Sequence, residues 1–199
     1  MAEINYLETG AELAVTAWDI LSGDIKAGSQ VLIYDETGDH TGLQTAETLT
    51  EAGARVDMLT PDRSISRDVP GMNLSPYLKT LQSRDVTFTQ GRRLVGIAKN
   101  GNHLTAKIGT DYSDHFDEKD YDQIIVNQGV VPMDDLYLAL KPQSSNLGEV
   151  DYEALIEGRP QTINSNPNGA FQLFRIGDAV SARNIHAGIY DALRLVRHL

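Results

Sequence analysis

The first third of the chain alternates between short apolar runs and helical apolar stripes. Residues 29–34 form a β-rich run of strand length that ends in the turn-prone stretch 35–41. Apolar residues then recur at helical spacing from Gly42 to Gly53, and residues 54–59 alternate as a second strand. This order predicts a β-α-β unit. An earlier apolar stripe over 11–21, which Gly23 ends, predicts a short amphipathic helix.

The rest of the chain carries a second set of strand and helix patterns. A helix over 74–81 leads to a strand at 86–89, and the alternating runs 93–98 and 103–108 flank an Asn-Gly pair that predicts an antiparallel hairpin. Half of the residues in 111–122 are Asp or Glu, so we expect a solvated connection there. The remaining predicted segments are a strand at 123–127, a loop-dominated stretch at 141–169, a strand at 171–176 and a final helix with an apolar stripe from Ile185 to Val196.

These elements together predict a three-layer α/β nucleotide-binding fold of the Rossmann type. We expect a parallel sheet with helices on both sides and an antiparallel β excursion over 86–108. The 199 residues, of which 41% are hydrophobic, can hold one generous domain or two small interlocked ones.

Composition and charge narrow the function classes. The formal net charge of -11 repels phosphate backbones and anionic membranes, so nucleic acid is not an expected partner. The absence of Cys removes disulfides, thiol redox centres and iron–sulfur ligation, so any electrons must travel through a bound cofactor. The apolar runs are too short to span a bilayer and the acidic start lacks a basic signal-peptide region. A cytoplasmic location is therefore the expectation.

Three landmarks occur in a fixed order along the chain. They are the strand, glycine loop and helix of 31–52, the Gly-x-x-Pro of 129–132, and the sequence Phe-Arg-Ile-Gly-Asp-Ala at 174–179. This order resembles flavoproteins with two dinucleotide domains, in which a nicotinamide-binding domain is inserted into a flavin-binding domain. More narrowly, the loop Tyr-Asp-Glu-Thr-Gly-Asp-His-Thr-Gly at 34–42 and the segment 175–184 look like the tail of trimethylamine dehydrogenase-type and Old Yellow Enzyme-type NADH:flavin oxidoreductases. Relatives in that group include demethylases of dimethylglycine or N-methylproline.

The resemblance covers about 11–199 and implies that the chain is the carboxy-terminal part of a longer flavin-dependent oxidoreductase. Residues 1–128 would be an NAD(P)-binding-like Rossmann domain with the β excursion. Residues 129–199 would be the returning, incomplete segment of a flavin- or ADP-binding domain. The resembled proteins carry the FMN-binding barrel, the amine site and a Cys-ligated iron–sulfur cluster upstream of this region, and this sequence contains none of them. We therefore expect no catalytic residue here, and FMN and iron–sulfur chemistry only in the missing upstream part.

The loop 35–42 keeps part of the chemistry of a dinucleotide-binding loop. Gly42 stands where the third glycine of Gly-x-Gly-x-x-Gly opens the helix, and Gly38 is the only other glycine in the loop. Three acids stand where a diphosphate would bring further negative charge: Asp35, Glu36 and Asp39. The second strand ends at Thr60 rather than at a ribose-binding acid. NAD(P) binding is therefore doubtful, and we expect the fold to survive as a scaffold.

The Gly177–Asp178 turn has two open interpretations. Asp178 could bind a ribityl or ribose hydroxyl of FAD or ADP, as the resemblance implies, or it could simply cap the final helix. The intact motif, together with Gly129 in Gly-x-x-Pro at the expected distance, favours the nucleotide role in the parent protein. Without the missing half-domain the cleft is incomplete, so we expect weak binding of the nucleotide. We also expect exposed apolar surface on 171–176 and on the final helix, and therefore self-association, as in a homodimer.

Other chemistry finds little support in the sequence. His115 lies among acids on a polar stretch, which is typical of a solvated surface, so no metal site is expected. Two rival functions remain, namely a degenerate, non-catalytic Rossmann module whose acidic face docks an electron-transfer partner or dimerises, and a stand-alone NAD(P)H reductase. The nucleotide-binding interpretation requires that Gly42 and Gly177 each lie between the end of a parallel strand and the beginning of a helix.

Overall fold

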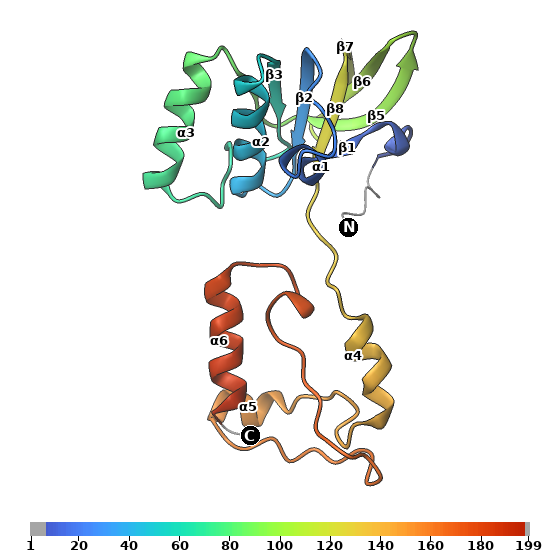
Figure 1. The fold of residues 1–199 in the computed structure, drawn as a ribbon, viewed down its shortest axis with the longest axis vertical. Coiled ribbons are helices and arrows are strands. Elements are labelled where there is room, and N and C mark those ends of the chain that lie inside the picture. Colours follow the sequence, from blue (N-terminus) through green and yellow to red (C-terminus); the bar gives the residue numbers. More distant parts are fainter. Residues whose placement is uncertain (1–6, 198–199) are drawn as a thin grey trace. The chain divides into compact units, whose positions relative to one another are not determined.

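The computed structural model describes residues 7–197 and divides the chain into two compact units, which meet between Gly129 and Val130 (Figure 1). We call residues 7–129 the first unit and residues 130–197 the second unit, and describe each by itself. The expected assignment of 1–128 as NAD(P)-binding-like and of 129–199 as flavin- or ADP-binding stays a prediction. Within the described residues, no helix combines the length and the apolar character needed to cross a membrane.

The first unit is built on a parallel sheet of five strands in the order β1-β8-β2-β3-β4. These strands are β1 (Val15–Thr16), β2 (Gln30–Asp35), β3 (Arg55–Leu59), β4 (Thr87–Thr89) and β8 (Gln123–Asn127). β2 pairs with β3 on one side, and on the other side it pairs with β8 so that Asp35 lies beside Asn127. The predicted β-α-β unit is present, and the carboxyl ends of β2 and β8 are neighbours although 92 residues separate them.

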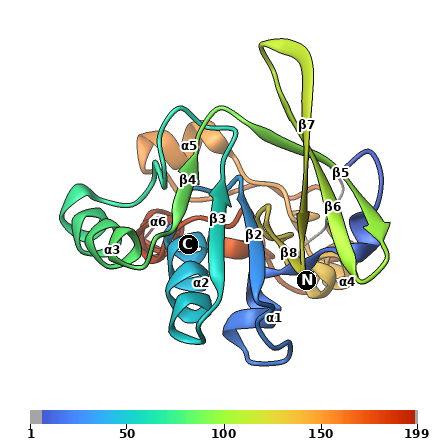
Figure 2. The same ribbon diagram turned by 90° about the horizontal axis from the view of Figure 1, so that it is seen from above.

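Two different layers cover the faces of this sheet, as Figure 2 shows. The helices α1 (Ala17–Leu21), α2 (His40–Glu51) and α3 (Gly71–Ser83) pack on one face. The other face carries an antiparallel sheet of β5 (Arg93–Asn100), β6 (His103–Thr110) and β7 (Ser113–Tyr121). β2 is buried on both faces, with Val31 and Ile33 toward the helices and Leu32 and Tyr34 toward the antiparallel sheet. The three-layer α/β fold is confirmed, but the expectation of helices on both sides is wrong for the first unit.

The expected single helix over 11–21 is also wrong. The segment contains a short 3-10 helix, η1 (Ala11–Leu13), then β1, and only then α1. The side chain of Thr16 accepts a hydrogen bond from the Asp19 amide at 3.2 Å, and Asp19 Oδ2 accepts one from the Thr16 amide at 2.8 Å. This reciprocal cap fixes the start of α1 at Ala17. The residues before it are therefore free to pair with β8.

The acidic stretch 111–122 forms a strand rather than the expected solvated connection. Most of it is β7, which pairs with β6 in antiparallel register from Leu104 opposite Tyr121 to Thr110 opposite Ser113. Only Tyr121 is buried, so the side chains are solvated as expected while the backbone completes the sheet. Charge composition reports the environment of side chains and says little about backbone pairing, which explains the error.

The second unit is helical and carries no sheet in its described residues. It contains α4 (Asp135–Leu140), η2 (Lys141–Gln143), α5 (Tyr152–Glu157), η3 (Gly177–Ala179) and α6 (Ile185–Val196). The strand expected at 171–176 is wrong, because only Phe171 makes a bridge, to Ser144. A strand needs a partner of several residues, and the second unit offers 171–176 none.

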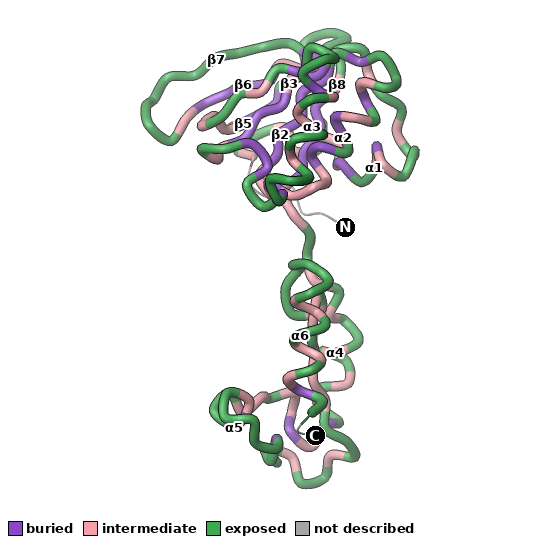
Figure 3. The backbone as a smooth tube through the Cα atoms, turned by 90° about the vertical axis from the view of Figure 1, so that its left-hand side faces the viewer, coloured by how far each residue is buried: buried purple, intermediate pink, exposed green. Residues whose placement is uncertain are grey.

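Apolar side chains are unevenly covered between the two units. Both hydrophobic clusters consist of residues from Leu7 to Val126, all in the first unit. Of the 19 exposed large hydrophobic residues among those described, 15 lie in the second unit. They include Phe171, Ile176 and four residues on one stripe of α6, namely Ile185, Ile189, Leu193 and Val196. Figure 3 shows the same contrast, and the expected exposure of 171–176 and the final helix is confirmed.

Candidate functional site

The loop between β2 and α2 is organised around a buried carboxyl group. Asp35 is the last residue of β2 and is fully buried. Its Oδ1 accepts hydrogen bonds from the Gly38 amide at 3.2 Å, the Thr37 hydroxyl at 3.1 Å and Asn127 Nδ2 at 2.9 Å. Its Oδ2 is buried and has no hydrogen-bond partner in the described chain. Burial raises the pKa of Asp35 to about 6, against the opposing effect of these three donors.

Gly42 lies next to this carboxyl group but not at the expected place. It is the third residue of α2, which begins at His40, so the condition that Gly42 precede the helix is not met. A Cβ atom at Gly42 would lie 2.7 Å from Asp35 Oδ2 and 3.0 Å from the end of Met58. Glycine is needed here because the carboxyl group approaches the first turn of α2 too closely for any side chain.

The other two acids of the loop also have partners inside the first unit. Glu36 accepts hydrogen bonds from the Tyr34 hydroxyl at 2.9 Å, Arg93 at 2.9 Å and Gln128 Nε2 at 2.8 Å. Burial and the neighbouring Glu36 raise the pKa of Tyr34, so its hydroxyl stays a donor. Asp39 caps α2 by accepting from the Thr41 amide at 2.8 Å. The three charges that would repel a diphosphate are thus used to hold the loop.

Gly38 and Gly129 lie at the edges of the same loop. A Cβ atom at Gly38 would lie 3.0 Å from Arg67 Cγ, and the Gly38 carbonyl accepts from the Asp68 amide at 3.0 Å. A Cβ atom at Gly129 would lie 3.8 Å from Thr37, just beyond the end of β8. Three of the five candidate glycine and acid positions therefore gather around Thr37 and Asp35 in the first unit, and two lie in the second unit.

Gly177 opens a 3-10 turn that packs closely on α6. It adopts a φ of +57°, a backbone conformation that favours glycine, and its amide donates to Asp191 Oδ2 at 3.2 Å. A Cβ atom at Gly177 would lie 3.4 Å from the Cα of Gly188, so two glycines allow the turn to approach the helix. The preceding segment is not a sheet strand and α6 begins only at Ile185, so the condition set for Gly177 is also not met.

Asp178 does not cap the final helix. Asn184 caps α6 by accepting from the Ala187 amide at 2.9 Å. Asp178 is exposed, and among the described residues its carboxylate accepts one long hydrogen bond, from the Arg183 amide at 3.4 Å. The carboxylate is therefore left free to accept a hydrogen bond from a molecule outside the second unit.

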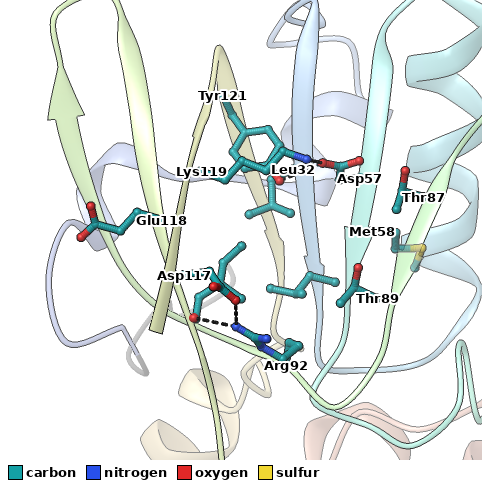
Figure 4. A pocket seen from close by; sticks show the side chains of 12 residues that line it. Leu32, Asp57, Met58, Thr87, Thr89, Arg92, Asp117, Glu118, Lys119 and Tyr121 are labelled. Carbon is teal, nitrogen blue, oxygen red and sulfur yellow. Dashed lines mark hydrogen bonds and ion pairs between the residues drawn. The ribbon is translucent and has the colours of Figure 1, made fainter. Parts of the chain in front are cut away.

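A cleft of about 270 Å³ lies between β3, β4 and the antiparallel sheet of the first unit (Figure 4). Its ends carry two ion pairs, Arg92 with Asp117 and Lys119 with Asp57, the latter at 2.5 Å. Burial raises the pKa of Asp57, but the hydrogen bonds from Lys119 and from the Tyr121 hydroxyl outweigh burial and hold this pKa below its ordinary value. The cleft thus presents paired charges over an apolar floor, and none of these groups is a free acid or base.

The described residues contain no group of three or more His, Cys, Asp or Glu side chains that could hold a metal ion. His115 lies on β7, exposed, with its Nε2 3.1 Å from Asp117 Oδ1. The sequence predicted a solvated surface position for His115 but placed it on a loop, whereas it lies on a strand.

Comparison with known proteins finds relatives that are similar to nearly the whole of this chain. No family model matches it. A protein of Rhizobium meliloti (strain 1021) described as a probable N-methylproline demethylase is 54% identical over 193 residues, which are 97% of this chain and 28% of that protein. An N,N-dimethylglycine/sarcosine dehydrogenase of Chromohalobacter salexigens is 38% identical over 93% of this chain and 27% of its own length. The chain is homologous to one region of these demethylases and dehydrogenases. The resemblance found in the sequence is confirmed, and the chain spans little more than a quarter of its relatives.

Solved structures show the same fold. Histamine dehydrogenase from Rhizobium sp. 4-9 matches with a TM-score of 0.71 at 18% identity, over 96% of this chain and 27% of that one. An amine oxidase from Pseudomonas geniculata N1 that acts on 6-hydroxypseudooxynicotine matches with a TM-score of 0.67 at 21% identity, over 92% of this chain and 24% of that one. The Rossmann-like α/β fold is therefore confirmed by both geometry and comparison.

Sequence reasoning missed the residues that satisfy the acidic loop. Asn127 ends β8 and Gln128 follows it, far along the chain from the loop, and Arg93 begins β5. The order of strands in the sheet carried a usable signal, because the polar residues that follow two adjacent parallel strands meet at one edge. That order was not deduced from the sequence.

Proposed function

We propose that this chain is the carboxy-terminal nucleotide-binding-fold part of a longer flavin-dependent oxidoreductase that demethylates an N-methylated amine. The observation that carries the proposal is the 54% identity to the N-methylproline demethylase over nearly the whole chain. The matched region is 28% of that relative, and we assign the amine site, the FMN barrel and any iron–sulfur cluster to the rest of the parent protein. A flavin there would accept the hydride equivalent from the N-methyl carbon, and water would then release that carbon as formaldehyde.

The two units would share the work unequally. The first unit serves as a scaffold, since its loop acids are satisfied internally. We infer that the second unit forms one wall of a site for FAD or ADP in the parent protein. The condition set for Gly177 fails in this chain because 171–176 has no partner strand, and the upstream region of the parent would have to supply one.

Asp178 offers a carboxylate for a ribityl or ribose hydroxyl. A hollow of about 300 Å³ beside the turn is lined by Ile176 and Val180 together with three arginines, Arg175, Arg183 and Arg194. In this chain Arg175 is paired with Asp134 and Arg183 with Asp191, so these two would have to exchange partners to bind a phosphate. Guanidinium groups suit the phosphates of such a cofactor.

The residues present fit only part of such a cofactor site. Asp178 is open to solvent, and the apolar residues that flank the turn are exposed rather than enclosing a cavity. The remaining walls, including the phosphate loop, would come from the upstream region of the parent, which is also the expected covering for 171–176 and α6.

A second candidate function is docking of an electron-transfer partner. The observation that favours it is the exposed acids of β7 that no ion pair with another described residue neutralises: Asp114, Glu118 and Asp120. Asp117 of the same strand is paired with Arg92. Salt-sensitive binding of a basic redox protein to the full-length parent would support this function. The stand-alone NAD(P)H reductase ranks last and would require NADH oxidation by this chain alone.

The proposal is tested in the full-length parent carrying Asp178→Ala. We expect the unaltered parent to release formaldehyde from N-methylproline, dimethylglycine or sarcosine, and to be purified with a bound adenine nucleotide or flavin dinucleotide. Asp178→Ala should lower the dinucleotide content about 10-fold or more, because a hydrogen bond to a charged acceptor contributes about 1.5–3 kcal/mol. Glu153→Ala, an exposed acid on α5, is the matched control and should leave the content unchanged.

The outcomes separate the parts of the proposal. Absence of demethylation of any N-methylated amine by a flavin-loaded parent would overturn the function. Demethylation with equal dinucleotide content in Asp178→Ala and the unaltered parent would remove Asp178 from the cofactor site.

A further inference from the structure

The amino terminus of α2 lies beside a carboxyl group of the protein itself, that of Asp35. In a working dinucleotide fold, the loop between strand and helix binds a phosphate through backbone amides and the positive end of the helix. Here the buried Asp35 carboxyl group stands at that place. Its Oδ1 collects three donors, and its unpartnered Oδ2 points at the first turn of the twelve-residue helix, 2.7 Å from where a Cβ atom of Gly42 would lie.

The space around the loop is closed as well as charged. Arg67 fills the side of Gly38, and its guanidinium group pairs with Asp62 at 2.7 Å. Glu36 has three donors and Asp39 caps α2, so neither acid is free to move away from an incoming anion without breaking contacts. A diphosphate would have to displace Asp35 and these neighbours together.

Asn127 connects the same carboxyl group to the end of β8. Its Nδ2 donates to Asp35 Oδ1 at 2.9 Å and to the Thr37 hydroxyl at 2.6 Å, and its carbonyl accepts from the Glu36 amide at 3.0 Å. The loop therefore holds the last residue of β8, two residues before the first unit ends.

We propose that Asp35 is a resident anion, which takes the place of a dinucleotide phosphate at the amino terminus of α2, closes the loop to NAD(P) and fastens the end of β8 through Asn127. This proposal concerns the first unit alone and holds whether or not the second unit binds a nucleotide. The site that the carboxylate fills is suited to a small oxyanion, and formate is the simplest probe of it.

The test removes the carboxylate and returns it as a free ion. Asp35→Gly in the 199-residue chain leaves the Gly38 amide, the Thr37 hydroxyl and Asn127 Nδ2 converging on an empty place. We expect a Tm about 4–8 °C below that of the unaltered chain at pH 7.5, because unsatisfied buried donors are costly. Sodium formate should recover at least half of this loss in a saturable manner, while sodium chloride of equal ionic strength should not. Asp35→Asn, which keeps an acceptor in the side chain, should show no formate-specific gain.

Two results would overturn the proposal. One is a folded Asp35→Gly chain whose Tm responds equally to formate and chloride. The other is stoichiometric NADH binding by the unaltered chain that shifts the Gly38 amide resonance.

If Asp35→Gly does not fold, a pH titration of the unaltered chain followed by NMR tests the proposal instead. The resident anion requires the Gly38 amide and Asn127 side-chain resonances to shift together as the Asp35 carboxyl group titrates. Independence of these resonances from that titration would overturn the proposal equally.

Discussion

The pKa values of two carboxyl groups on adjacent strands of the same sheet are shifted in opposite directions, and the hydrogen-bond and ion-pair partners of the two groups explain the difference. Asp57 on β3 is partly exposed and is paired with the positive charge of Lys119, so its ionised form is favoured. Asp35 on β2 is fully buried and receives only neutral donors, so burial outweighs its hydrogen bonds and raises its pKa to about 6, which still leaves the carboxyl group mostly ionised at pH 7.5. The ionisation of Asp57, which has a charged partner, and that of Asp35, which has only neutral partners, should thus respond differently to pH although the two residues lie on adjacent strands.

The first prediction concerns how Asp35 couples the free energy of unfolding to pH. Its pKa is about 6 in the folded chain and its ordinary value is 3.8. Between these values the folded chain keeps a proton that the unfolded chain has released, so the free energy of unfolding contributed by Asp35 falls as the pH rises from about 4 to about 6. The total loss is on the order of 2–3 kcal/mol as an upper estimate. Urea unfolding of the unaltered chain and of Asp35→Asn between pH 4 and 7.5 measures it.

Asp57→Asn is the matched control for this pH dependence. The pKa of Asp57 is lowered in the folded chain, so its contribution should grow as the pH rises and be lost on acidification. The unaltered chain should therefore lose stability relative to Asp35→Asn as the pH rises from about 4 to about 6. It should gain stability relative to Asp57→Asn at lower pH, as the pH rises toward about 4. Differences of the same sign for the two variants would contradict the burial argument.

At the scale of elements, the sequence predicted helices and strands whose apolar pattern indicates burial. It failed for strands whose presence or absence depends on backbone pairing with another strand. β2 and β8 were predicted from continuous apolar runs, and α2 and β3 from apolar residues at helical and alternating spacing, and all four bury those residues. β7 was missed because its pairing with β6 is a backbone property that exposed acids do not reveal. The strand at 171–176 was predicted from its apolar pattern, but a pattern cannot supply the partner strand that the second unit lacks.

The acidic loop shows the same limit at a candidate site. The sequence brought Asp35, Glu36 and Asp39 into one loop and indicated that they oppose a diphosphate. It could not show that Asn127 and Arg93 satisfy them, because those contacts depend on β8 lying beside β2 and on the antiparallel sheet covering that face. A cluster of acids in a sequence therefore indicates that these side chains require hydrogen-bond or ion-pair partners, while the topology determines which residues those partners are.

The second prediction is that Arg93 joins the antiparallel sheet to the β2–α2 loop. Its guanidinium group contacts Glu36 at 2.9 Å and both oxygens of Asp111 at 3.1 Å. Glu36 is only 19% exposed in its side chain, so Arg93→Ala leaves a largely buried acid without its cation. We expect urea unfolding to show a loss of about 1–2 kcal/mol, after allowance for the partial exposure of Arg93.

Arg84→Ala provides the control for Arg93→Ala. Arg84 is similarly exposed, at 34% against 38% for Arg93, but its acidic partner Glu51 is 65% exposed and lies 3.4 Å away. Such a pair contributes about 0–1 kcal/mol. In the Glu36→Gln background, the effect of Arg93→Ala should shrink toward that of Arg84→Ala. Equal losses for both arginines in the unaltered chain would mean that the pair with Glu36 has no special role.

At the scale of the whole molecule, the two units differ in whether they can bury their own apolar residues. The first unit has a cluster on each face of its sheet, whereas the second unit has few buried side chains and none in either cluster. A unit that leaves its apolar stripe open needs a covering surface, and the relatives are more than three times as long as this chain. We therefore expect the second unit to depend for its packing on the upstream region of the proposed parent protein.

The last prediction follows from the uncovered α6 stripe. In the 199-residue chain the residues of this stripe are more than half exposed, so they should bind a hydrophobic dye and drive concentration-dependent association. Ile189→Glu with Leu193→Glu should lower both the dye fluorescence and the weight-average mass in sedimentation. Met72→Glu with Tyr112→Glu, which alters two exposed apolar residues of the first unit, should change neither by a comparable amount. In the full-length parent, the α6 pair should instead destabilise the protein, because there the stripe is expected to be covered. An associating chain whose mass is unaffected by the α6 substitutions, or a parent that tolerates them, would show that the stripe is not a covered surface.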